Sequence, residues 1–109
     1  LIIGYAPCEL HGIAKGGMNH CQDEMKKAVK AGYWNLFSFN PALKAEGKNP
    51  LSIDSKEPTE SYRDFIQSET RYSRLIQAFP DRAEALFSKA AENAKAKYEN
   101  LVKLSKLYE

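Results

Sequence analysis

Residues 1–18 decide the predicted fold, and they read Leu1-Ile2-Ile3-Gly4-Tyr5-Ala6-Pro7-Cys8-Glu9-Leu10-His11-Gly12-Ile13-Ala14-Lys15-Gly16-Gly17-Met18. The apolar residues 1–6 predict a short buried strand that ends at Pro7, because proline lacks the N–H that a ladder needs. A glycine-rich loop follows over residues 8–18, where glycine permits tight turns and close backbone approach. A lone buried strand leaves its backbone groups without partners, so we expect the terminal strand of a parallel sheet in a fragment of a longer protein.

The stretch after this loop predicts a helix and then an extended segment. The helix is expected over residues 19–31, with Asn19 as its N-cap and Gly32 as the residue that ends it. Residues 33–40 are rich in aromatic side chains and predict a strand that stops at Pro41.

The second half of the chain predicts a connector and two helices. Residues 41–58 contain prolines and a glycine that favour an irregular connector, with a short extended piece over 51–54. Two amphipathic helices are expected over about 59–79 and 81–108, separated by Pro80. The predicted fold class is therefore a helix-rich α/β fragment.

Composition narrows the classes of protein. Hydrophobic residues make up 43% and charged residues 28%, which is typical of a globular chain. The net charge of +2 is too small to favour binding to nucleic acid or to an anionic membrane. No apolar run approaches the roughly 20 residues that span a bilayer. With two cysteines and no secretory signal pattern, we expect a reducing, cytoplasmic setting.

Cys8 is the candidate site residue, because it follows a predicted strand and precedes the N-terminus of a helix. Ligands of open α/β sheets lie beyond the carboxyl ends of strands, and helix N-termini favour anions. An iron–sulfur cluster held by four thiolates is such an anion. Two interpretations stay open from the residues alone: Cys8 is one ligand of a cluster completed from elsewhere, or it is a small buried hydrophobe.

The other polar residues of this region carry weaker signals. Cys21 lies in the first turn of the predicted helix, where it is either a reactive thiol or a packed side chain. A Cys8–Cys21 disulfide is disfavoured by the expected compartment. His11 and His20 lie close to both cysteines, but the spacing does not match that of paired zinc ligands.

Neither a nucleotide fingerprint nor a complete catalytic set is present. The glycines of the loop do not fit the spacing of a P-loop or of a dinucleotide-binding motif. Trp34 and the neighbouring aromatic residues are interpreted as core or interface. Spacing alone therefore predicts no activity for this chain.

Several longer strings carry a resemblance to a known family: Leu1–Cys8, His11–Ile13, Lys15–Met18, Ala31–Trp34, Phe39–Leu43, Gly47–Pro50, Leu51–Pro58, Arg71-Tyr72 and Phe79-Pro80. Together they resemble the end of the thiamine-diphosphate domain in pyruvate:ferredoxin (flavodoxin) oxidoreductases, over nearly the whole chain. The chain departs from that pattern at residues 19–21, where the family has Gly, Lys and Ser or Thr.

The resemblance implies that residues 1–109 are the C-terminal portion of a thiamine-diphosphate/iron–sulfur domain. Residues 1–58 would hold the strand, cluster loop, helix and connector, and residues 59–109 a helical tail. The [4Fe–4S] cluster nearest the thiamine takes three cysteines from earlier in such a domain and a fourth from the A-P-C segment, which here is Cys8. No catalytic or thiamine-binding residue is carried over.

The same resemblance implies the activity and partners of a parent enzyme. Such an enzyme, usually a homodimer, oxidatively decarboxylates pyruvate with thiamine diphosphate and Mg²⁺ and passes the acetyl group to coenzyme A. Its electrons go to ferredoxin or flavodoxin, and no nucleic acid or membrane partner is expected. Two alternatives stay open: a related 2-oxoacid:ferredoxin oxidoreductase, or a non-catalytic helical interaction module.

Overall fold

The computed structural model describes residues 1–8, 12–13 and 17–109 of the chain, and these residues are predominantly helical. Their elements, in chain order, are η1 (Gly17–His20), α1 (Cys21–Lys30), β1 (Phe37–Phe39), α2 (Ala42–Ala45), β2 (Leu51–Ile53), α3 (Tyr62–Ser68), α4 (Thr70–Ala78) and α5 (Pro80–Leu107).

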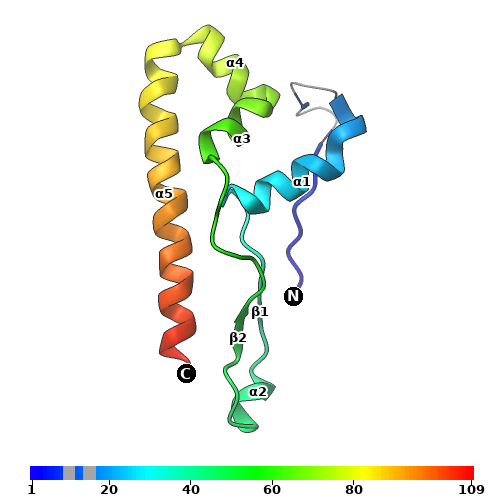
Figure 1. The fold of residues 1–109 in the computed structure, drawn as a ribbon, viewed down its shortest axis with the longest axis vertical. Coiled ribbons are helices and arrows are strands. Elements are labelled where there is room, and N and C mark those ends of the chain that lie inside the picture. Colours follow the sequence, from blue (N-terminus) through cyan, green and yellow to red (C-terminus); the bar gives the residue numbers. More distant parts are fainter. Residues whose placement is uncertain (9–11, 14–16) are drawn as a thin grey trace.

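The molecule is elongated, and its longest helix determines the shape. Helix α5 runs along one side, the β1–β2 hairpin extends beside its C-terminal half, and α3 lies between α5 and α1 (Figure 1). The extents are 53 × 30 × 23 Å and the radius of gyration is 16.4 Å. A compact chain of this length has a radius of gyration of about 13 Å. The molecule is therefore more extended than a compact globular domain of the same length.

The hydrophobic core lies where α1, α3 and α5 meet. Six buried side chains form it: Ala28, Ala31, Phe65, Ile66, Ala83 and Phe87. The alanines let the helices approach closely, and the larger side chains of Phe65, Ile66 and Phe87 fill the space between them. This core fixes the position of α1 against α3 and α5.

Local sequence explains the C-terminal end of α1 but not its start. Gly32 has φ +78°, and the N–H groups of Gly32 and Tyr33 donate to the carbonyls of Val29 (3.1 Å) and Ala28 (2.9 Å). This is the Schellman arrangement, so the prediction that Gly32 ends the helix is confirmed. The prediction of Asn19 as N-cap is wrong, because Asn19 lies within the 3-10 turn η1 and His20 occupies the N-cap position.

The one sheet among the described residues is an antiparallel hairpin. Strand β1 pairs with β2 in the register Phe37↔Ile53, Ser38↔Ser52 and Phe39↔Leu51. The short extended piece predicted over 51–54 is therefore confirmed, and the strand predicted over 33–40 is shorter than expected. Leu36 and Asn40 continue the hairpin, because Leu36 O accepts from Asp54 N–H at 2.8 Å and Asn40 N–H donates to Pro50 O at 2.8 Å.

The parallel strand predicted over residues 1–6 is not confirmed. Residues 1–8 have no strand assignment, and the side chains of residues 1–3 are fully or largely exposed. The physical reason is that a strand needs a neighbour for its N–H and C=O groups, and none of the described segments lies alongside this one as a strand.

The first of the two long helices is broken, contrary to the prediction of one helix over 59–79. Helix α3 ends at Ser68, and Glu69 adopts an extended conformation (φ −86°, ψ 123°) before α4 begins. Ser61 caps α3 by accepting the N–H of Asp64 at 3.2 Å. No proline or glycine occurs between Tyr62 and Ala78, so the break arises from tertiary contacts.

Helix α5 confirms the second predicted helix, and Pro80 lies at its first turn as expected. Of its predicted apolar stripe, Ala83, Phe87 and Leu101 are buried. Leu86 and Leu104 are about half exposed, because the molecule is too narrow to cover the whole stripe.

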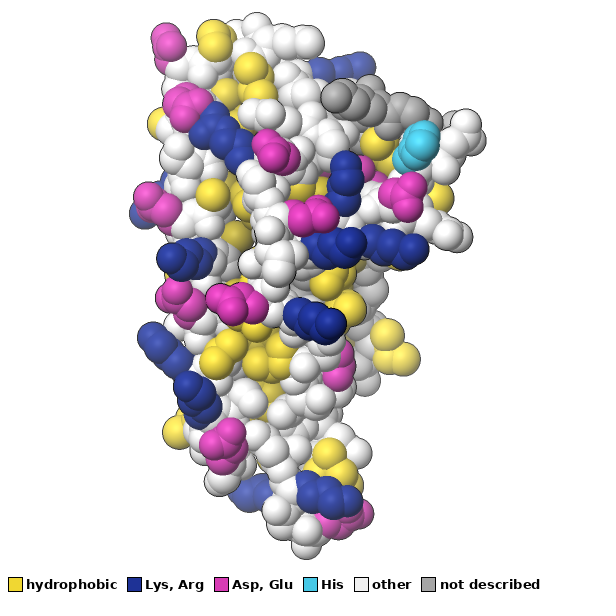
Figure 2. All heavy atoms as spheres, in the orientation of Figure 1, with side chains coloured by type: hydrophobic (Ala, Val, Ile, Leu, Met, Phe, Trp, Pro, Cys, Tyr) yellow, Lys and Arg dark blue, Asp and Glu magenta, His cyan; other side chains and the backbone are white. Residues whose placement is uncertain are grey.

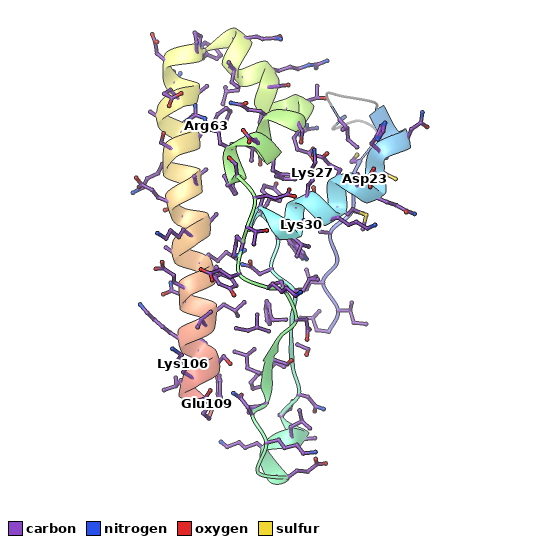
Figure 3. The ribbon with its side chains drawn as sticks, viewed as in Figure 1. Asp23, Lys27, Lys30, Arg63, Lys106 and Glu109 are labelled. Carbon is purple, nitrogen blue, oxygen red and sulfur yellow. The ribbon has the colours of Figure 1, made fainter. Side chains whose placement is uncertain are left out.

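Charges are spread over the visible face without a large patch of one sign (Figure 2). Lys27 and Lys30 lie in the last turn of α1, where the helix dipole favours cations (Figure 3). Within the described residues, no helix is both long and apolar enough to cross a membrane.

Candidate functional site

Cys8 lies at the end of the extended N-terminal segment, with its side chain exposed and its thiol free. Its carbonyl oxygen accepts a hydrogen bond from the N–H of Gly12 at 3.0 Å. This bond links the backbone of Cys8 directly to that of Gly12. The thiol therefore faces outward from a backbone that is held in place, which suits a ligand offered to a group outside this chain.

The glycine-rich loop has the backbone geometry that its sequence predicts at two described positions. Gly12 has φ +79° and Gly17 has φ +59°, both in the left-handed region that favours glycine. The side chains of His11 and Lys15, like Gly16, lie outside the described residues. His20 is exposed at the N-cap of α1, with its Nδ1 3.7 Å from a carboxylate oxygen of Asp23.

Cys21 is the first residue of α1 and is half-buried. Both cysteines are free, so the structure contains no Cys8–Cys21 disulfide. Of the apolar residues farther along α1, Ala28 is fully buried and Met25 is about one-third exposed. Among the residues that the structure describes, no three His, Cys, Asp or Glu side chains converge as a metal site. A metal or cluster bound at Cys8 would therefore need further ligands from outside the described residues.

A buried acidic cluster, which lies between α1 and the α3–α4 break, was not predicted from the sequence. Glu24 of α1 and Glu69 of the α3–α4 break are 4% and 5% exposed, and the Ser68 hydroxyl donates to Glu24 Oε1. Burial, a hydrogen bond with Glu24 and the charge of Glu24 raise the pKa of Glu69 to about 7. Two glutamates on elements far apart in sequence give no local signal of burial, since Glu is usually exposed.

Aromatic side chains anchor the segment that carries Cys8. Tyr5 stacks on Trp34 and meets Tyr33 edge-on, with ring centroids 5.7 Å apart in both pairs. The Tyr33 hydroxyl lies 3.1 Å from that of Tyr72 on α4, and burial raises the pKa of Tyr33 well above its ordinary value. Trp34 and Tyr33 therefore pack against the core as predicted, whereas Phe37 is exposed on the hairpin.

The sequence of the chain is similar to segments of known proteins. No family model matches it. It is 53% identical over 105 residues, 96% of its length, to the pyruvate:ferredoxin oxidoreductase of Moorella thermoacetica. It is 49% identical over 98 residues (90% of its length) and 44% identical over 105 residues (96%) to the pyruvate-flavodoxin oxidoreductases of Klebsiella pneumoniae and Enterobacter agglomerans. The chain matches one segment of proteins named pyruvate:ferredoxin or pyruvate-flavodoxin oxidoreductase.

The resemblance of the sequence strings to pyruvate:ferredoxin (flavodoxin) oxidoreductases is therefore confirmed. The chain spans only 8–9% of the length of these three oxidoreductases. Their ferredoxin and flavodoxin names show that similar segments occur in enzymes with different electron acceptors.

Proposed function

We propose that the chain is part of an oxidoreductase that oxidatively decarboxylates pyruvate, forms acetyl-CoA and reduces ferredoxin or flavodoxin. The observation that supports this most strongly is the identity of 44–53% to three such enzymes over at least 90% of the chain. The non-catalytic helical module is not favoured, because the match runs through the N-terminal segment as well as the helices.

Within that enzyme, we propose that Cys8 supplies one thiolate ligand of a [4Fe–4S] cluster. Its exposed thiol and its anchored carbonyl fit a donor to a group bound mainly by other segments. When bound, such a cluster transfers single electrons, and backbone N–H groups near its sulfurs adjust its reduction potential. The remaining three ligands would come from other parts of the parent chain.

The rest of this chain would act as a support for that ligand. Tyr5 and Trp34 hold the segment before Cys8, and the α1–α3–α5 core holds helix α1. Residues 1–6 would gain strand partners from a parallel sheet in the parent domain, which would cover the apolar side chains exposed here. Thiamine diphosphate and Mg²⁺ would be bound by other parts of the parent enzyme, which we propose to be a homodimer.

The proposed activity is tested with the full-length protein that contains this chain. It should reduce ferredoxin or flavodoxin only when pyruvate and coenzyme A are both present, and should form acetyl-CoA in the same reaction. Activity with another 2-oxo acid and none with pyruvate would replace this proposal with the related oxidoreductase. No reduction with any 2-oxo acid would contradict both.

A further inference from the structure

The break between α3 and α4 has a cause outside its own sequence. Neither proline nor glycine lies in the broken stretch, yet Glu69 leaves the helical region and forms an antiparallel bridge with Ile13. Ile13 is 8% exposed, so the bridge is buried against the body of the molecule. The helix is thus interrupted where it meets the loop that follows Cys8.

Two backbone hydrogen bonds connect this break to Cys8. The N–H of Thr70, the first residue of α4, donates to the carbonyl of Gly12 at 3.3 Å. The N–H of Gly12 donates in turn to the carbonyl of Cys8 at 3.0 Å. The position of the Cys8 backbone therefore depends on the N-terminal end of α4 through a single intermediate residue.

Gly12 is required at this junction for two independent reasons. Its φ of +79° is unfavourable for any residue with a Cβ. A Cβ built on Gly12 would also lie 2.8 Å from Oγ1 and 3.2 Å from Cβ of Thr70. Gly47 has a similar φ of +74° but nothing within 4 Å of its Cβ position. Comparing Gly47→Ala with Gly12→Ala therefore separates the cost of the positive φ from the steric clash with Thr70.

The buried acidic cluster holds the other side of the same junction. The Ser68 hydroxyl contacts Glu24 on α1 and lies 2.5 Å from the carbonyl oxygen of Phe65, one turn back in α3. A serine that bonds back into its own helix weakens the next turn. Ser68 therefore favours the end of α3 at this residue and allows the backbone of Glu69 to pair with the loop.

We infer that Gly12 and Thr70 are positioning residues that fix the Cys8 backbone through the α3–α4 break. The inference rests on the proposed function, because it concerns the cluster that Cys8 is proposed to bind. Gly12 and Thr70 thus set the geometry of the ligand without being ligands themselves.

Thr70→Pro in the full-length oxidoreductase tests the inference. Proline removes the N–H that bonds to Gly12, but it is well tolerated at the first helical position, and the extended Glu69 suits a residue before proline. Thr70→Ala is the matched control, because it removes the side chain and keeps the N–H. The iron and sulfide contents of each protein are measured. The midpoint potentials of its clusters are determined by redox titration monitored by low-temperature EPR.

We expect Thr70→Pro to shift the midpoint potential or the line shape of one cluster signal. The spectrum of Thr70→Ala should be the same as that of the wild type. The affected signal should be the one that Cys8→Ser removes. Gly12→Ala should alter that signal also, and Gly47→Ala should not. This second pair keeps the inference testable if Thr70→Pro does not fold.

The outcomes separate the two proposals. If Cys8→Ser removes one cluster signal while Thr70→Pro and Gly12→Ala match their controls, the positioning role is wrong and the ligand role stands. If Cys8→Ser leaves every cluster signal intact, the ligand role fails, and the positioning role fails with it.

Discussion

Replacing Glu69 with glutamine should change how the stability of the 109-residue chain depends on pH. Glu69 is 5% exposed, and its pKa rises from 4.5 to about 7, chiefly because burial disfavours the charged carboxylate. One pKa unit corresponds to about 1.4 kcal/mol, so the rise corresponds to about 3 kcal/mol. The native state binds more protons than the unfolded state between these two pKa values. The free energy of unfolding therefore falls as the pH rises from about 4.5 to about 7, and this contribution is constant above that range.

The glutamine side chain of this variant would remain neutral at every pH. The variant would therefore not show this decrease in unfolding free energy with rising pH. Relative to the wild type, Glu69→Gln should therefore gain up to about 3 kcal/mol in unfolding free energy between about pH 4 and about pH 8. The measurement is urea denaturation followed by circular dichroism at pH steps across that range. Glu99→Gln, at an exposed position on α5, is the control and should show no such trend. A difference between Glu69→Gln and wild type that stays constant across the whole range would refute the reasoning.

Three further predictions concern packing and association. Phe87→Ala should lower the free energy of unfolding by about 3–5 kcal/mol in urea denaturation, because this 3%-exposed ring lies in the core. Gly47→Ala should cost about 1–2 kcal/mol through its positive φ, and Gly32→Ala should cost more in the same assay. The extra cost arises because a Cβ on Gly32 would lie 2.9 Å from Pro58 Cγ. Deleting residues 1–3 should reduce self-association of the isolated chain in sedimentation velocity without loss of helical signal, because these apolar residues are exposed and belong to no element.

The features that the sequence predicts correctly are those determined by neighbouring residues. Gly32 ends α1 because a left-handed residue satisfies two carbonyls of the last turn, and Pro80 starts α5 because its missing N–H is not needed there. The extended piece predicted over residues 51–54 is also found, as strand β2, although its pairing with β1 was not predicted.

The features that escaped prediction depend on contacts between distant segments. Glu69 breaks a helix because its backbone pairs with Ile13, and nothing in the residues around Glu69 indicates that pairing. The burial of Glu24 follows from the same junction. Asn19 has a side chain suited to capping, but the 3-10 turn places His20 at the cap.

The site itself was predicted from similarity more than from physics. The residues alone left Cys8 open between a ligand and a buried hydrophobe, and its side chain is exposed in this chain. The junction that holds Cys8 was not predicted, because Gly12 and Thr70 are far apart in the sequence and no local pattern links them.

The most direct test of the account is to count the reduced clusters of the full-length oxidoreductase by low-temperature EPR after Cys8→Ser. Cys21→Ser is the matched control, since Cys21 is the other free cysteine and has no proposed ligand role. The account predicts that Cys8→Ser loses the signal of one cluster, with a matching fall in iron and sulfide, and that Cys21→Ser keeps the complete set. A complete set of cluster signals in Cys8→Ser would contradict it.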